Sequence, residues 1–121
     1  MEWKEIAPNE GKKFEEDFAN SVDKEECWLY RLRDNAASFG GGMNTRFTSS
    51  NICDYIMFHN RTKTLYLFEM KSTKSSSISY SMIRDNQINE LTRSSKYNLI
   101  AGFVFNYREK ENATYFMNIK D

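Results

Sequence analysis

The spacing of apolar residues predicts two helices. Between residues 9 and 22, apolar side chains including Phe14 and Phe18 recur every four positions, and charged residues fill the positions between them. This spacing is typical of an amphipathic helix with one buried face. A shorter helical pattern lies near 84–95, with Ile88 and Leu91 expected to face inward. We expect both helices to pack against a sheet.

Other segments carry the patterns of β-strands. Five stretches rich in aliphatic and aromatic residues predict strands: 27–32, 52–58, 64–71, 99–107 and 113–119. The polar turn 59–63 joins the second and third as a hairpin, whereas 33–50 is polar and contains three consecutive glycines, as a loop does. The segment 99–107 is apolar nearly throughout, which is typical of a central strand buried on both faces. The order α-β-β-β-α-β-β predicts an α/β fold, a mixed central sheet flanked by helices.

Length and composition limit the class of protein. The chain has 121 residues, of which 40% are hydrophobic and 28% charged, so we expect one globular domain over 1–121. Two cysteines cannot form a disulfide framework. No apolar run approaches the roughly 20 residues that a membrane helix needs, and the N-terminus is too acidic for a signal peptide. We expect a cytoplasmic protein without a membrane partner.

The net charge of zero conceals a division along the chain. Residues 1–26 hold nine acidic residues against four lysines, whereas residues 27–96 hold ten basic residues against five acidic ones. A polyanion responds to the local field of the surface that it meets. The basic middle can therefore bind phosphates, although scattered solvated charges explain the same composition equally simply.

The candidate catalytic side chains lie on the predicted hairpin. Side chains alternate along a strand, so Glu69 and Lys71 point to one face of an otherwise apolar strand. Folding the hairpin about the turn 59–63 places Asp54 roughly opposite Glu69. Two neighbouring carboxylates repel each other, and a divalent cation relieves that repulsion. Oxygen ligands favour Mg²⁺ or Mn²⁺ over zinc.

An acid and a lysine two residues apart are weak evidence in isolation. An exposed strand with a simple ion pair gives the same pattern. Asp54 on the preceding strand strengthens the interpretation as a metal site, and so do the motifs around it.

Four motifs occur in one order along the chain: Gly11-Lys12-Lys13-Phe14-Glu15-Glu16, Cys53-Asp54-Tyr55, Phe68-Glu69-Met70-Lys71-Ser72 and Asp85-Asn86-Gln87-Ile88. In this order the sequence resembles the PD-(D/E)xK nuclease superfamily, and specifically the small, phage-like form of RecU-type Holliday-junction resolvases. The resemblance covers about residues 9–119. It implies a restriction-endonuclease-like αβββαβ core.

The resemblance also implies roles for individual residues. Asp54 and Glu69 look like carboxylates that bind Mg²⁺, for which Mn²⁺ substitutes, with no small-molecule cofactor. Lys71 looks like the residue that positions the attacking water and offsets charge on the scissile phosphate. Glu15 would add an acid near the metal, and Gln87 resembles a helix-borne glutamine that lines the site.

The implied activity is a magnesium-dependent endodeoxyribonuclease that resolves four-way DNA junctions by paired nicks during recombination or phage DNA processing. Two nicks in strands of like polarity suit a two-fold homodimer. The candidate interfaces are the N-terminal arm with Trp3 and Ile6 and the C-terminal strand with Tyr115, Phe116 and Met117, although both can simply fill the core. Basic residues near the motifs are the candidates for phosphate contacts: Lys12, Lys13, Arg31, Arg33, Arg46, Lys74 and Arg84.

Two departures from the family and several alternatives accompany this interpretation. Cys53 stands where the superfamily's name has proline, and the segment 33–50 is shorter than the projecting insertion of cellular members. A restriction- or repair-type endonuclease on the same fold is one alternative. A non-catalytic DNA-binding modulator of recombination is another, as is an unrelated α/β domain with accidental motifs.

Overall fold

A computed structural model describes residues 10–32 and 51–121 of the chain. The helices are α1 (Glu10–Ser21) and α2 (Asp85–Ser94), with short 3₁₀ turns at η2 (Tyr80–Met82) and η3 (Arg108–Lys110). The strands are β1 (Cys27–Arg31), β2 (Tyr55–His59), β3 (Thr64–Thr73), β4 (Ile100–Tyr107) and β5 (Ala113–Asn118). These elements follow the order expected from the sequence.

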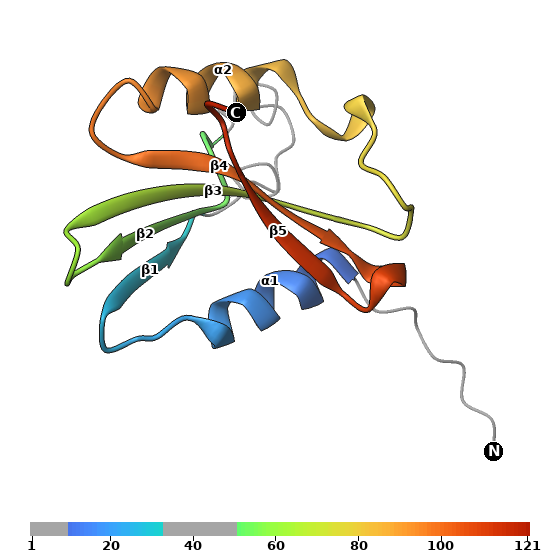
Figure 1. Cartoon of the computed structure of the whole chain (residues 1–121), viewed down its shortest axis with the longest axis horizontal. Coiled ribbons are helices and arrows are strands. Elements are labelled where there is room, and N and C mark those ends of the chain that lie inside the picture. Colours follow the sequence, from blue (N-terminus) through green and yellow to red (C-terminus); the bar gives the residue numbers. More distant parts are fainter. Residues whose placement is uncertain (1–9, 33–50) are drawn as a thin grey trace, which may run out of the picture.

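The strands form one sheet in the order β1-β2-β3-β4-β5. All neighbouring strands are antiparallel except β3 and β4, which run parallel. A parallel pair needs a crossover connection, and α2 supplies it. The sheet is therefore mixed, as predicted, and β3 and β4 lie at its centre (Figure 1).

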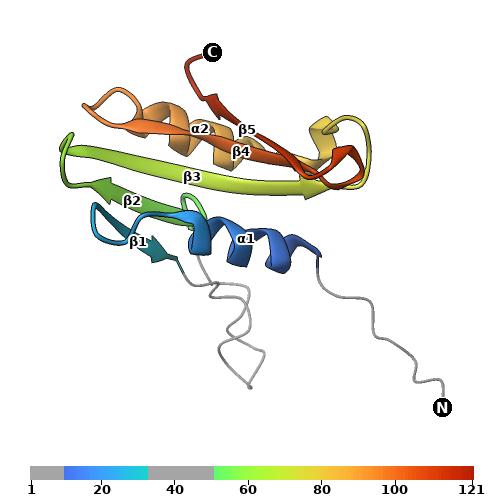
Figure 2. The ribbon, with the colours of Figure 1, turned by 60° about the horizontal axis from the view of Figure 1, so that its bottom comes forward.

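The two helices cover opposite faces of the sheet (Figure 2). On the α1 face, Phe14 packs in one core cluster with Phe68 and Met70 of β3. On the α2 face, Leu91 packs with Leu67 of β3 in a second cluster. Ile88, which was also expected to face inward, is 38% exposed and lies outside that cluster. Alternate residues of β3 thus reach different cores, as the period of two along a strand requires.

A close approach of β5 to β4 requires glycine at position 102. A Cβ atom there would lie 2.1 Å from the Met117 carbonyl oxygen and 2.9 Å from the Phe116 ring. Both contacts are closer than side chains tolerate. Gly102 therefore lets the edge strand β5 pack directly across the buried strand β4.

The predicted α/β fold is confirmed, with small shifts at the ends of elements. β3 continues to Thr73 because Ser72 and Thr73 still pair with β4. β2 begins at Tyr55, so Asp54 directly precedes the strand. Among residues 10–32 and 51–121, no helix is long and apolar enough to cross a membrane.

Candidate active site

Strand β3 presents an acid and an amine on the α2 face of the sheet. Glu69 and Lys71 alternate with Met70, whose side chain is buried in the α1-face core. The Lys71 Nζ atom lies 3.5 Å from Glu69 Oε2. Glu69 is only 6% exposed, so its charge is largely withdrawn from water. Burying an ionised carboxylate is costly unless a cation compensates it.

Asp54 is held beside Glu69 by the backbone of β3. Its amide nitrogen donates to the Phe68 carbonyl oxygen at 3.0 Å, which continues the β2–β3 ladder by one residue. Its Oδ2 atom accepts a hydrogen bond from the Met70 amide at 2.8 Å. These two bonds bracket Glu69 and fix the Asp54 carboxylate next to it, as the predicted register requires.

The electrostatics of Glu69 show how close the two carboxylates are. Burial, and after it the negative charge of Asp54, raise the pKa of Glu69 to about 7, and Lys71 opposes this rise. Among the described residues that form ion pairs here, two cationic side chains, Lys71 and Arg31, face the three carboxylates of Glu15, Asp54 and Glu69, so negative charges outnumber positive ones by one. The oxygen donors of Asp54 and Glu69 fit a hard divalent cation such as Mg²⁺ or Mn²⁺, which would supply the missing positive charge.

Gln87 connects α2 to the site. Its Nε2 atom donates to Glu69 Oε2 at 2.7 Å, and its Oε1 atom accepts from the Arg84 amide at 3.1 Å. The second bond belongs to the capping box at the start of α2. A side chain fixed at both ends of its amide orients the Glu69 carboxylate. The structure therefore brings Gln87 together with Asp54, Glu69 and Lys71.

Arg31, at the end of β1, links α1 to the site. Its Nε atom lies 2.6 Å from Glu15 Oε1, and its Nη1 atom lies 3.9 Å from Asp54 Oδ1. The same guanidinium donates to the Leu32 carbonyl oxygen and stacks over the Tyr55 ring at 5.6 Å. Glu15 thus contacts Asp54 through Arg31. The sequence interpretation treated Arg31 only as a phosphate contact and missed this link, for which the sequence carries no local signal.

The other basic residues with a predicted DNA-binding role lie outside this constellation. Lys12, Lys13, Lys74 and Arg84 are exposed, and Lys13 pairs with Asp17 at 3.2 Å. Arg33 and Arg46 fall outside the described residues. The role of this set in phosphate binding stays a prediction.

Two further observations delimit the site. Within the described part of the chain, no group of three or more His, Cys, Asp or Glu side chains is arranged to hold a metal ion. A cavity of about 350 Å³ lies elsewhere, between α1 and the end of β4, and is lined by Phe14, Asn106 and Arg108 among others. The candidate metal site therefore consists of two carboxylates on the other face of the sheet.

The fold was compared with those of solved structures. The Archaeoglobus fulgidus protein Hjc, a Holliday junction resolvase from an archaeal hyperthermophile, superposes with a TM-score of 0.61 over 91% of this chain and 78% of its own, at 19% sequence identity. This chain has the same fold as Hjc. At that identity the likeness establishes the architecture, a restriction-endonuclease-like α/β fold.

Among curated sequences, the SPbeta prophage-derived uncharacterized protein YotM of Bacillus subtilis (strain 168) is 38% identical over 121 residues. The match includes 95% of this chain and 58% of YotM, so the chain spans a little over half the length of that relative. No protein-family model matches the sequence.

Proposed function

We propose that this protein is a metal-dependent DNA endonuclease that nicks four-way junctions. One observation carries the proposal: on the fold that Hjc shares, Asp54, which directly precedes β2, lies beside Glu69 and Lys71 of β3. Because the fold alone does not determine chemistry, the argument depends on these three side chains.

Each of these residues would have a different role in phosphodiester hydrolysis. Asp54 and Glu69 would hold the divalent ion. An Mg²⁺ ion held there would polarise a phosphoryl oxygen and lower the pKa of a water ligand. The ammonium group of Lys71 would offset negative charge on the scissile phosphate and orient the attacking water. Gln87 keeps the Glu69 carboxylate in place, and the resemblance implies products with 5′-phosphate and 3′-hydroxyl ends.

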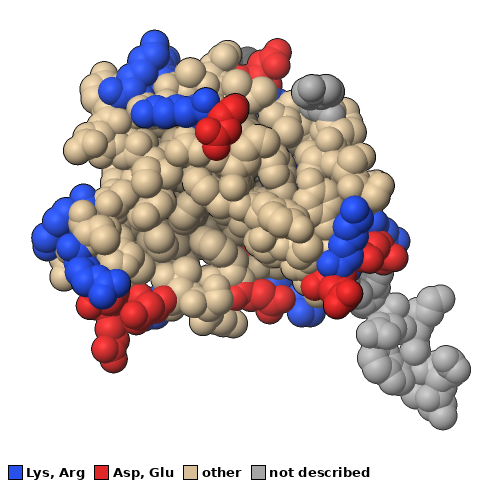
Figure 3. Space-filling view, viewed as in Figure 1, with Lys and Arg blue, Asp and Glu red and all other residues tan. Residues whose placement is uncertain are grey.

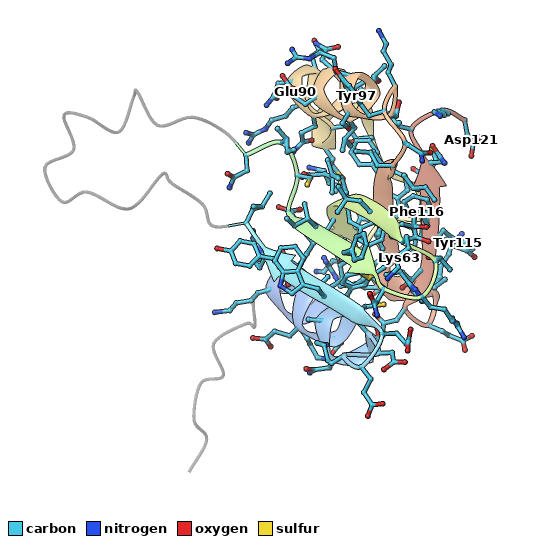
Figure 4. The ribbon with its side chains drawn as sticks, turned by 90° about the vertical axis from the view of Figure 1, so that its left-hand side faces the viewer. Lys63, Glu90, Tyr97, Tyr115, Phe116 and Asp121 are labelled. Atoms are coloured by element: carbon cyan, nitrogen blue, oxygen red, sulfur yellow. The ribbon has the colours of Figure 1, made fainter. Side chains whose placement is uncertain are left out.

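A homodimer would place two such sites for paired nicks, and β5 is the surface that we propose for it. Tyr115, Phe116 and Met117 are 60%, 44% and 43% exposed, so they do not simply fill the core. The other candidate interface, the N-terminal arm with Trp3 and Ile6, lies outside the described residues. Figure 4 places Tyr115 and Phe116 together along β5. Figure 3 shows that the middle of this face is uncharged, with charged residues at its rim. An uncharged edge strand pairs readily with a second copy.

The prophage-derived relative supports a setting in phage DNA processing. A restriction- or repair-type endonuclease on the same fold differs in substrate, since it would cut linear duplex. A non-catalytic modulator would have no use for the buried pairing of Glu69 with Lys71.

The test is cleavage of a synthetic four-way junction beside a linear duplex of the same sequence, in Mg²⁺, in Mn²⁺ and in EDTA. We expect nicks in the junction that require the metal and that fall at least about a hundredfold in Asp54→Asn and Lys71→Met. Arg93→Gln, an exposed change on α2, is the matched control. Equal cutting of both substrates would favour a restriction- or repair-type enzyme, and an Asp54→Asn protein as active as the parent would rule out the assigned site.

A further inference from the structure

Two aromatic side chains on the edge strand β1 share a face with the candidate active site. Trp28 pairs with Phe58 and Tyr30 with Ile56 across the β1–β2 ladder. Ile56 packs on the α2-face core, and residues directly opposite in an antiparallel pair point to the same face. Trp28 and Tyr30 therefore lie on the α2 face, which is also the face of Glu69 and Lys71.

These two rings are exposed and already aligned with each other. Trp28 is 56% exposed and Tyr30 is 46% exposed. Their centroids are 5.9 Å apart and their planes differ by 22°, so the rings are stacked along the strand. Helix α2 packs against β4, three strands from β1 in the sheet. Among the described elements, no helix covers the aromatic pair on this face (Figures 1 and 2).

The distance from this pair to the site suits one nucleotide step or two. Tyr30 lies opposite Ile56, which lies opposite Leu67, and Glu69 is two residues further along β3. With strands about 4.8 Å apart and a rise of about 3.3 Å per residue, the Cα atoms of Tyr30 and Glu69 are roughly 12 Å apart. Arg31, the next residue along β1, is already part of the site.

We propose that Trp28 and Tyr30 form a stacking platform for unpaired bases of the DNA strand whose phosphate lies at Glu69 and Lys71. This inference rests on the proposed function and adds a substrate feature to it. Every base offers a π-face to an exposed ring, and such stacking tolerates any sequence. Bases in a fully paired duplex are not available to it. The platform therefore favours DNA whose base pairs open readily near the cut, as those next to a branch point do.

The experiment measures binding in EDTA, so that it does not depend on cleavage. Trp28 is one of two tryptophans, and a Trp3→Phe protein makes it the sole tryptophan reporter. We expect a single-stranded oligonucleotide and a four-way junction to quench Trp28 fluorescence, and a blunt duplex of equal length to quench it far less. Tyr30→Ala should weaken binding of the single strand by about five- to a hundredfold, and Tyr30→Phe should restore it.

Tyr97→Ala is the matched control, because Tyr97 is 75% exposed and Figure 4 places it beside α2. Equal losses in Tyr30→Ala and Tyr97→Ala, or unchanged affinity in Tyr30→Ala, would overturn the platform. So would size-exclusion chromatography showing that Trp28→Ala dissociates a dimer, since the pair would then contact a second copy. A protein that cuts junctions but binds single strands equally well with Tyr30→Ala would refute the platform and leave the nuclease proposal intact.

Discussion

At the scale of single residues, the site depends on Glu69, a carboxylate whose surroundings disfavour its ionised form. Glu69 is buried, faces Asp54 and has Lys71 as its cationic neighbour. In the metal-free protein this arrangement stabilises the protonated acid. A divalent cation bound there, as we propose, would reverse the preference, because it would bind the ionised form.

The pKa of Glu69 predicts how stability changes with pH in EDTA. It is raised from 4.5 to about 7 in the folded chain, so the folded state holds a proton that the unfolded state has already released. Its contribution to the free energy of unfolding is complete below about pH 4.5 and is lost as pH rises through 7. Melting temperatures between pH 5 and 8 should show this decline, and Glu69→Gln should flatten it. A decline of the same size in Glu69→Gln would show that another group is responsible.

The environment of Glu69 can also be tested through Cys53, by an experiment that does not depend on DNA cleavage. Cys53 is 2% exposed, and burial, with the charges of Glu69 and Asp54, raises the pKa of its thiol to about 12. The half-buried Cys27 on β1 is the internal comparison. At pH 8, iodoacetamide should label Cys53 at least about a hundredfold more slowly than Cys27. Mass spectrometry of a time course measures both rates, and equal rates would contradict the buried position.

Sequence reasoning reached Asp54, Glu69 and Lys71 because a period of two and a short hairpin settle which side chains meet. It did not reach the Glu15–Arg31–Asp54 chain of charges. That chain joins a helix and two strands, and no local pattern reports how α1 lies across the sheet. The packing of α1 on β3, set by Phe14 and Phe18, brings Glu15 within reach.

At the scale of elements, the position of β5 depends on Gly102. The Cβ of any other residue would meet the Met117 carbonyl oxygen and the Phe116 ring. The apolar pattern of 99–107 predicted a buried strand, and β4 is buried from Ala101 to Asn106. The close crossing of β5 was beyond sequence reasoning, because a glycine in a strand does not reveal which neighbour approaches it.

Gly102→Ala should lower the free energy of unfolding by about 1–3 kcal/mol, since either β5 or β4 must shift. Chemical denaturation followed by circular dichroism measures the change. Ala113→Gly, near the start of β5, serves as a control, because it adds no side-chain atom between β4 and β5. A fully stable Gly102→Ala protein would mean that β5 moves away from β4 without cost.

At the scale of the whole molecule, the site is built from parts that are distant in sequence. α1 contributes Glu15 through Arg31, the hairpin contributes Asp54, Glu69 and Lys71, and α2 contributes Gln87. The order of these elements was predictable, because each is strongly patterned. Whether their side chains come within contact distance of one another depends on tertiary packing, which a pattern of apolar positions does not specify.

Arg31→Gln should show how far this assembly supports activity. It removes the cation between Glu15 and Asp54, so we expect kcat for junction nicking to fall about tenfold or more while junction binding in EDTA falls less. Arg61→Gln, an exposed change in the β2–β3 turn, is the control. If binding and kcat fall equally, Arg31 acts mainly as a phosphate contact, as the sequence alone indicated.

The bridge from Glu15 through Arg31 to Asp54 also has a consequence for the timing of activity during synthesis. Glu15 lies sixteen residues before Arg31 and Arg31 twenty-three before Asp54, and Gln87 leaves the ribosome later still. A partly made chain therefore lacks a complete set of supports around its carboxylates. Refolding followed in parallel by nicking and by circular dichroism should show secondary structure returning first and DNA nicking last.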